Sequence, residues 1–128
     1  MRNIAINCIN ELGIRVHNEG TYVCIEGPRF STRAESKIYR DVFRADIIGM
    51  TLVPECILAR ESEICYLSVS TITDYDVWAD KPVSSREIIE TLNKNVETTR
   101  RILENVIPMI HEEQNNCSCG NALKDAIL

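Results

Sequence analysis

Apolar and polar residues follow two different periods along this chain, and each change of period marks a new element. Residues 3–12 carry apolar side chains at every third or fourth position, which indicates the buried face of a helix. Gly13 follows where helices commonly end in a left-handed residue. Residues 21–25, TYVCI, are rich in β-branched and aromatic side chains, as is typical of a strand. The pattern therefore predicts a helix followed by a strand.

Two further helices are predicted from the residues that would start them. Thr32 and Glu35 have the spacing of a capping box, in which each side chain bonds the other residue's backbone N–H, and this predicts a helix to about Phe43. Pro54 suits the first position of a helix, because its ring fixes φ and its missing N–H would have no partner there. That helix is predicted to run to about Ser62.

Two apolar runs predict further strands. Residues 46–50, DIIGM, are a short run typical of a buried strand. Residues 64–73, ICYLSVSTIT, carry the strongest strand signal in the chain, because they are nearly uninterrupted and rich in β-branched side chains. Such a composition favours a strand that is buried on both faces.

A long helix is predicted near the end of the chain. Ser84 and Glu87 form a second capping box, and apolar residues at helical spacing follow as far as Val106. Pro108 lies just beyond them, so we expect the helix to end there.

The tail is predicted to be a separate segment. Residues 111–120 are polar and indicate a linker, and residues 122–128 predict a short terminal helix. We therefore divide the chain into a folded unit, residues 1–110, and a terminal segment, residues 111–128.

The order of these elements places the chain in the α/β class. Strands separated by helices need crossover connections, which are right-handed and give a parallel sheet. Only about three strands are predicted, and such a sheet would be small, with exposed edges.

Composition and charge narrow the class of protein. The 128 residues are 45% hydrophobic and 26% charged, which is typical of a globular domain and excludes a collagen-like or disordered chain. The net charge of −5 argues against a nucleic-acid partner. The longest run without a charge, residues 64–73, is about half of what a membrane-spanning helix needs. The first ten residues hold no apolar core of a signal peptide, so we expect a cytoplasmic location and no membrane partner.

Six cysteines and two histidines are the candidate metal ligands and disulfide partners. Cys117 and Cys119 form a C-x-C pair, whereas the other four cysteines are scattered through apolar stretches. A disulfide that closes so short a loop would be strained and reducible, and two free thiols are at least an equal alternative. Zinc sites usually need four ligands at closely paired spacings, which this sequence does not offer, so we predict no metal site.

Residues that could bind a ligand follow each predicted strand, where open α/β sheets hold their ligands. Phe30 and Ser31 follow the first strand and could stack on a ring and hydrogen-bond; a turn before a capped helix is the alternative. Thr51 follows the second strand and could contact an anion, or merely cap a helix. Asp74 and Asp76 follow the third and could accept hydrogen bonds from an amino group and a protonated ring nitrogen. Metal binding or solvated turn acids are the alternatives there.

Three motifs together resemble one family. The stretches EGPRFSTRAES (residues 26–36), ADIIGMTLVPE (45–55) and TDYDVWADKPV (73–83) are similar to those of the 5′-methylthioadenosine phosphorylases, within the purine nucleoside phosphorylase superfamily. They occur in the family's order and spacing, and the similarity covers nearly the whole chain. The resemblance implies the C-terminal half of a three-layer αβα fold with a mixed, largely parallel sheet.

The resemblance also implies a reaction and roles for residues. Phosphate, a co-substrate rather than a cofactor, attacks the ribose C1′ of 5′-methylthioadenosine and releases adenine and 5-methylthioribose 1-phosphate. Asp74 then acts as general acid at purine N7, and Asp76 helps to hold the base. The other implied contacts are Phe30 and Ser31 around the base, Met50 against the ribose, Thr51 on phosphate and Ser85 beside the 5′-methylthio group. Glu35 and Arg33 are expected to hold the local structure.

The resemblance also bears on which base is bound and on whether this chain is active alone. Relatives that act on 6-oxopurines carry Asn and Glu where this chain has Asp74 and Ser31, so adenine is the expected base. The family's Gly-rich loop and Arg-His pair, which hold phosphate, have no counterpart in these 128 residues. We therefore expect little activity from this chain alone, and a homotrimer or hexamer when the enzyme is complete. The alternatives are a non-enzymatic remnant or assembly module, and a 6-oxopurine nucleoside phosphorylase.

Overall fold

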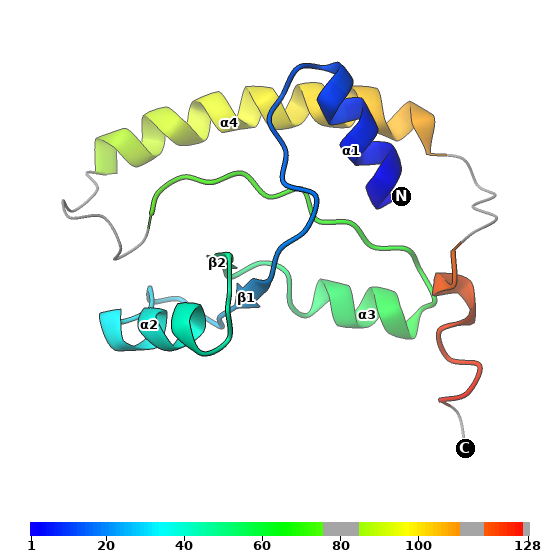
Figure 1. The fold of residues 1–128 in the computed structure, drawn as a ribbon, viewed down its shortest axis with the longest axis horizontal. Helices are drawn as coiled ribbons and strands as arrows, with labels where there is room; N and C mark the ends of the chain where they lie inside the picture. The colour runs from blue at the N-terminus through cyan, green and yellow to red at the C-terminus, as the bar shows by residue number, and fades with distance from the viewer. Residues whose placement is uncertain (76–84, 111–116, 127–128) are drawn as a thin grey trace.

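A computed structural model describes residues 1–75, 85–110 and 117–126. In Figure 1, α1 and α4 lie together on one side, a long extended stretch passes below them, and the strands lie on the other side with α2 and α3. The elements are α1 (Arg2–Glu11), β1 (Tyr22–Cys24), α2 (Arg33–Asp41), β2 (Ile47–Gly49), α3 (Glu55–Glu61), α4 (Ser85–Val106), and the short 3₁₀ helices η2 (Ile107–Met109) and η3 (Cys119–Asn121). The α/β class is confirmed.

The buried core forms between the first and the last long helix. α1 contributes Ala5, Cys8 and Ile9, and α4 contributes Ile102 and Val106, all of which are buried. On each helix these residues are spaced one, three or four apart, so they share one face. Removing such side chains from water is the main stabilising term for this half of the molecule.

The turn after α1 has the geometry that the sequence predicts. Gly13 adopts φ +69 and donates its N–H to Asn10, while the N–H of Ile14 bonds to the carbonyl of Ile9. This pair of bonds is the Schellman motif, which satisfies the last carbonyls of a helix and favours glycine at the left-handed position. Ile14 is partly buried and packs against this core.

The two strands form a parallel pair connected by α2. Their register places Tyr22 opposite Ile47 and Cys24 opposite Gly49. The carboxylate of Asp46 accepts the N–H of Thr21 at 2.6 Å, so one side chain closes the start of the ladder. The expected parallel sheet is thus confirmed for the first two predicted strands. Antiparallel pairing, which a mixed sheet would need, is not present among the described residues.

The predicted third strand, residues 64–73, is an extended segment that pairs with no strand in the described part of the chain. Its burial alternates, with Leu67 and Val69 packed on the α1–α4 core and Ser68 and Ser70 exposed. The prediction of a strand buried on both faces is therefore wrong. β-Branched residues favour an extended backbone, but a ladder also needs a neighbouring strand. Here an α4 side chain, the Asn95 amide, donates to the Ile72 carbonyl instead.

The described part of the tail also differs from its prediction. Residues 122–126 form turns rather than an α-helix. The backbone N–H groups of Ala122, Lys124 and Ala126 each bond three residues back, as in a 3₁₀ arrangement, instead of four. Three predictions involve residues that the structure does not describe. These are Ser84 of the second capping box, Asp76, and residues 111–116 of the predicted linker.

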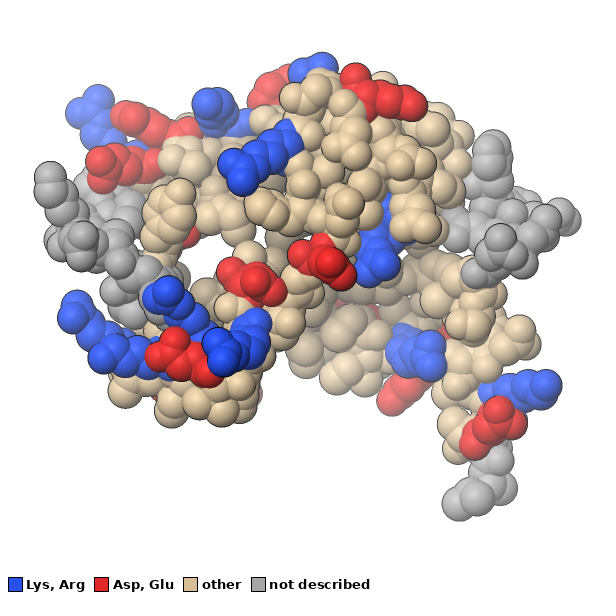
Figure 2. All heavy atoms as spheres, viewed as in Figure 1, with Lys and Arg blue, Asp and Glu red and all other residues tan. Residues whose placement is uncertain are grey.

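Charged side chains are unevenly spread over the surface. On the face shown in Figure 2, Lys and Arg gather over α2, with acidic groups among them. The α2 sequence RAESKIYRD accounts for this, because it carries three basic residues against two acidic ones. This local excess of positive charge was not expected from the overall charge of −5. Among the described helices, none is long and apolar enough to cross a membrane.

Candidate functional site

The loop that leaves β1 lies against the residue that leaves β2. Gly27 adopts φ +70, a conformation that disfavours a side chain, and a Cβ built there would lie 2.8 Å from the sulfur of Met50. The backbone angle therefore favours glycine, and any larger residue would also require the flexible Met50 side chain to move. The contact places Met50, the expected ribose neighbour, beside the loop that carries Phe30 and Ser31.

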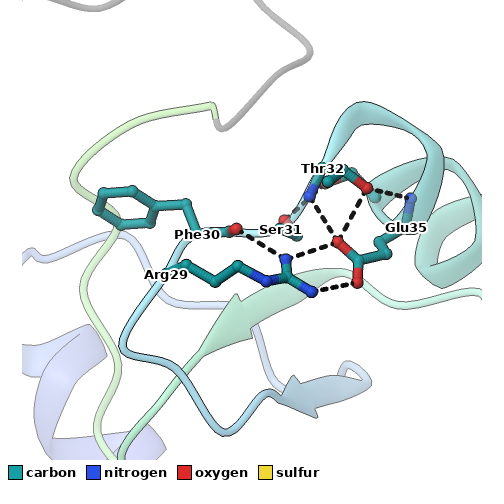
Figure 3. A network of polar contacts seen from close by, with 6 residues as sticks. Arg29, Phe30, Ser31, Thr32 and Glu35 are labelled. Atoms are coloured by element: carbon teal, nitrogen blue, oxygen red, sulfur yellow. Dashed lines mark hydrogen bonds and ion pairs between the residues drawn. The ribbon is translucent and has the colours of Figure 1, made fainter.

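The end of this loop is held by a network of polar contacts at the start of α2 (Figure 3). Thr32 Oγ1 accepts the N–H of Glu35 at 3.3 Å, and the carboxylate of Glu35 accepts the N–H of Thr32 at 2.6 Å. This is the predicted capping box, and it is confirmed. Two donors that would otherwise lack partners at the helix start are thereby satisfied.

Arg29 adds a second set of bonds to the same carboxylate. Its guanidinium donates from Nη1 to Oε2 of Glu35 at 2.8 Å and from Nη2 to Oε1 at 2.7 Å. Nη1 also donates to the carbonyl of Phe30 at 3.1 Å. The Arg29 side chain therefore bridges the loop and the helix, and the parallel pair of bonds sets its orientation.

These contacts change the protonation equilibrium of Glu35. The hydrogen bonds from Arg29, followed by those from Thr32, hold the pKa of the Glu35 carboxyl far below its usual range. The same pairing raises the pKa of Arg29. Glu35 thus holds the local structure, as predicted. Arg29 was not singled out from the sequence, although an acid six residues later was an available signal.

Ser31 lies at the buried side of this network. Its hydroxyl is 2.8 Å from that of Ser36, which is 2% exposed. Ser31 also lines an open hollow of about 620 Å³ between β1 and α2. Glu26, Arg29 and Glu35 supply charged groups to the same hollow. The lining of the hollow is therefore polar, although Arg29 and Glu35 bond mainly to each other.

Phe30 points away from that network. Its ring extends to the opposite side from the Arg29–Glu35 pair (Figure 3), and the residue is 81% exposed. The ring is therefore accessible for stacking, but among the described residues it does not line the hollow with Ser31.

Asp74 and Thr51 lie on two other segments. Asp74 is half-buried near the end of the extended segment and accepts the Thr73 hydroxyl at 2.8 Å. Thr51 is exposed, and α3 has Pro54 as its N-cap with no side-chain cap, so the alternative that Thr51 caps this helix is wrong. Ser85 is the first residue of α4. Neither Asp74 nor Thr51 lines the hollow beside Ser31 among the residues that the structure describes.

A group of three thiols lies away from these residues. Cys65, on the extended segment, and Cys117 and Cys119, in the tail, have sulfur atoms within 4.8 Å of one another. The sulfur atoms of Cys65 and Cys117 are 3.1 Å apart, and all six cysteines are free thiols. Sequence reasoning considered only the C-x-C pair, because nothing local connects it with Cys65.

The three thiols differ in acidity. Hydrogen bonding with Cys117 and then with Cys119 raises the pKa of Cys65 to about 11. The backbone N–H of Cys119, followed by the Cys65 thiol, lowers the pKa of Cys117 to about 7. Near neutral pH a substantial fraction of Cys117 is therefore thiolate.

Comparison with known proteins assigns the family. Residues 1–108 match the sequence profile of the phosphorylase superfamily. The chain belongs to this superfamily. Its relatives include the S-methyl-5′-thioadenosine phosphorylases of Nitrosopumilus maritimus, 61% identical over 91% of this chain, and of Pyrococcus abyssi, 53% identical over 97%.

Solved structures in the superfamily share the fold. Methylthioadenosine phosphorylase from Schistosoma mansoni in complex with adenine aligns with a TM-score of 0.82 at 33% identity, over 96% of this chain. The alignment covers 49% of that chain, and the two archaeal relatives are covered to 44% and 47%. The chain thus spans about half the length of the relatives it matches.

Proposed function

We propose that this chain provides the purine-binding part of a 5′-methylthioadenosine phosphorylase. The observation that carries the proposal is the identity of 48% to 61% with relatives of that name over 91% to 100% of the chain. In the reaction, a phosphate oxygen forms a bond to C1′ of the ribose while the bond from C1′ to adenine breaks. Adenine leaves with the bonding electrons and takes up a proton.

Asp74 is the proposed general acid. Negative charge builds on the departing purine, so a group that protonates or hydrogen-bonds N7 stabilises the transition state more than the bound substrate. Its half-buried position on the extended segment supports this role. Asp76, which lies outside the described residues, is proposed to accept from the 6-amino group.

Four further residues are proposed to contact substrate. Ser31 is proposed to hydrogen-bond the base, which its position in the hollow supports. Phe30 is proposed to stack on the base, for which its exposed ring must turn toward the hollow beside Ser31. Met50, held beside Gly27, is proposed to pack against the ribose. Thr51 is proposed to bind phosphate; its exposure before α3 supports this. Ser85 at the start of α4 is proposed to flank the 5′-methylthio group.

Adenine is the proposed base. While the protonated oxygen of Asp74 donates to N7, the other carboxyl oxygen only accepts hydrogen bonds. That oxygen suits an amino group and repels the carbonyl oxygen of a 6-oxopurine. Inorganic phosphate is the co-substrate, with no further cofactor proposed. We also propose that the complete enzyme is a cytoplasmic homotrimer or hexamer. We propose no nucleic-acid partner, because the net charge is −5.

Apart from Thr51, the phosphate-binding groups are proposed to come from residues other than these 128. The sequence contains no G-x-G or Arg-His pair. Phosphate is the nucleophile, and without groups that position it the activation free energy rises by several kcal/mol. An apolar groove of about 540 Å³ along α4 is open to solvent. This supports the proposal, because a further segment of the enzyme could cover the groove. The same groove favours the alternative of a non-enzymatic assembly module.

One complementation experiment distinguishes part of an enzyme from a non-enzymatic assembly module. The chain is assayed alone and after fusion behind the N-terminal half of the Nitrosopumilus maritimus relative, with release of adenine from 5′-methylthioadenosine as the readout. We expect phosphate-dependent release from the fusion and almost none from the chain alone. A folded fusion that releases no adenine would overturn the enzymatic proposal and favour the assembly module.

A further inference from the structure

Two segments distant in sequence bring three thiols together. Cys65 precedes Cys117 by 52 residues, yet their sulfur atoms are 3.1 Å apart, and the sulfur of Cys119 completes the group within 4.8 Å. All three residues are half-buried. A C-x-C pair alone offers two ligand atoms, and the third comes from the extended segment. We name Cys65, Cys117 and Cys119 the thiol cluster.

We propose that the thiol cluster binds one thiophilic d¹⁰ cation, of which Zn²⁺ is the first example and Cu⁺ the second. Thiolates are the ligands that these two ions select. Neither the phosphorylase reaction nor the proposed purine contacts use these three residues, so the inference is independent of the proposed function.

The spacing of the sulfur atoms fits such a site. A zinc–sulfur bond is about 2.3 Å long, so two thiolates on one tetrahedral ion lie about 3.8 Å apart. The Cys65–Cys117 distance of 3.1 Å would increase slightly, and the upper limit of 4.8 Å in the cluster would decrease. Changes of this size need only small side-chain rotations. Three protein sulfurs leave a fourth tetrahedral position for solvent.

A bound ion would fasten the tail to the rest of the molecule. The N–H of Leu123 already donates to the Glu63 carboxylate at 3.1 Å, two residues before Cys65. In this part of the tail the described residues form only short-range turns. Metal ligation would add bonds between the same two segments, and its free energy would oppose detachment of the tail.

Metal titration of the reduced chain tests the proposal. The purified protein is kept metal-free with a phosphine reductant, so that thiols cannot pair as disulfides, and is titrated with Zn²⁺ and separately with Cu⁺ against chromophoric chelators. We expect one equivalent of at least one ion to bind. The variants C65S, C117S and C119S should each weaken binding tenfold or more. The matched controls C24S and C56S alter half-buried thiols outside the cluster and should leave it unchanged.

A second measurement uses the unmodified chain. Sulfur-to-metal charge-transfer bands of the Co²⁺-loaded protein, together with metal-edge X-ray absorption, should report three sulfur ligands. The backbone amides of residues 117–126 should exchange their hydrogens with solvent more slowly when metal is bound. Failure of both Zn²⁺ and Cu⁺ to bind overturns the proposal. Binding that C56S weakens as much as C117S also overturns it, as does a Cys65–Cys117 disulfide forming in air while the reduced chain takes up neither ion.

Discussion

The guanidinium of Arg29 and the carboxylate of Glu35 face each other across the turn before α2, joined by two parallel hydrogen bonds of 2.8 and 2.7 Å. The same carboxylate closes the capping box with Thr32. One acidic side chain thus organises both the helix start and the loop that carries Phe30 and Ser31. The geometry of the proposed base-binding loop depends on this side chain.

The capping box should contribute measurably to stability. Thr32→Ala removes the oxygen that accepts the N–H of Glu35, and we expect a loss of about 1 kcal/mol in the free energy of unfolding. The matched control is Thr98→Ala in the middle of α4, where the hydroxyl only bonds the carbonyl of Lys94. Urea denaturation of both variants measures the difference. Equal losses would contradict a capping role for Thr32.

Acid should weaken the Arg29–Glu35 contact. The pKa of Glu35 is lower in the folded than in the unfolded chain, so its contribution to stability is complete above the unfolded value of about 4.3. That contribution is lost as the pH falls below about 4.3 toward the folded pKa. Glu35→Gln should therefore flatten the decrease in Tm between about pH 5 and pH 3.

The control for this pH dependence is Glu90→Gln. Glu90 pairs with Arg86 on the exposed surface of α4 at 2.9 Å, and such pairs contribute little. Its Tm profile should follow that of the unmodified chain. Identical profiles for Glu35→Gln and the unmodified chain would show that Glu35 has the same pKa in both states.

The close approach at Gly27 can be separated from its backbone angle. Gly27→Ala and Gly13→Ala both place alanine at a left-handed φ, which costs about 1–2 kcal/mol. Only at Gly27 does the new Cβ meet another group, the sulfur of Met50 at 2.8 Å. We expect Gly27→Ala to be the more destabilising, and Met50→Ala to relieve the excess in the double variant. Equal losses in the two alanine variants would contradict the close contact.

Asp74 should determine both rate and base preference in the fusion that carries the phosphate-binding half. Asp74→Asn should lower kcat about 100-fold with 5′-methylthioadenosine, because a general acid is lost. The ratio of kcat/KM for adenosine over inosine should also fall, because an amide can face either a carbonyl or an amino group. The exposed Asp41 at the end of α2 supplies the control, Asp41→Asn. An unchanged base preference in Asp74→Asn would exclude Asp74 from base recognition.

The α1–α4 core should tolerate truncation poorly. Ile102 is 4% exposed and its neighbour Leu103 is 41% exposed. Ile102→Ala should cost about 2–5 kcal/mol through lost burial and a residual cavity. Leu103→Ala should cost much less, because its side chain already contacts solvent. Denaturant midpoints of the two variants give the comparison, and similar losses would contradict the observed core.

The sequence by itself determined the elements whose stabilising bonds lie within a few residues. The capping box of Thr32 and Glu35 and the left-handed Gly13 after α1 are such cases. Their partners are three to five residues away, so spacing alone predicts the contact. The site assignments for Asp74 and Met50 came from resemblance to a family, because the chemistry of a single carboxylate or thioether does not specify a ligand.

Only the tertiary structure decided the contacts between distant segments. Nothing near Cys65 in the sequence indicates Cys117, and nothing near Gly27 indicates the sulfur of Met50. Residues 64–73 show the same limit, because β-branched side chains favour an extended backbone but cannot provide a neighbouring strand. The segment packs on the helical core because burial of Leu67 and Val69 is available there. Local preference sets the backbone of such a segment, and long-range packing sets its partner.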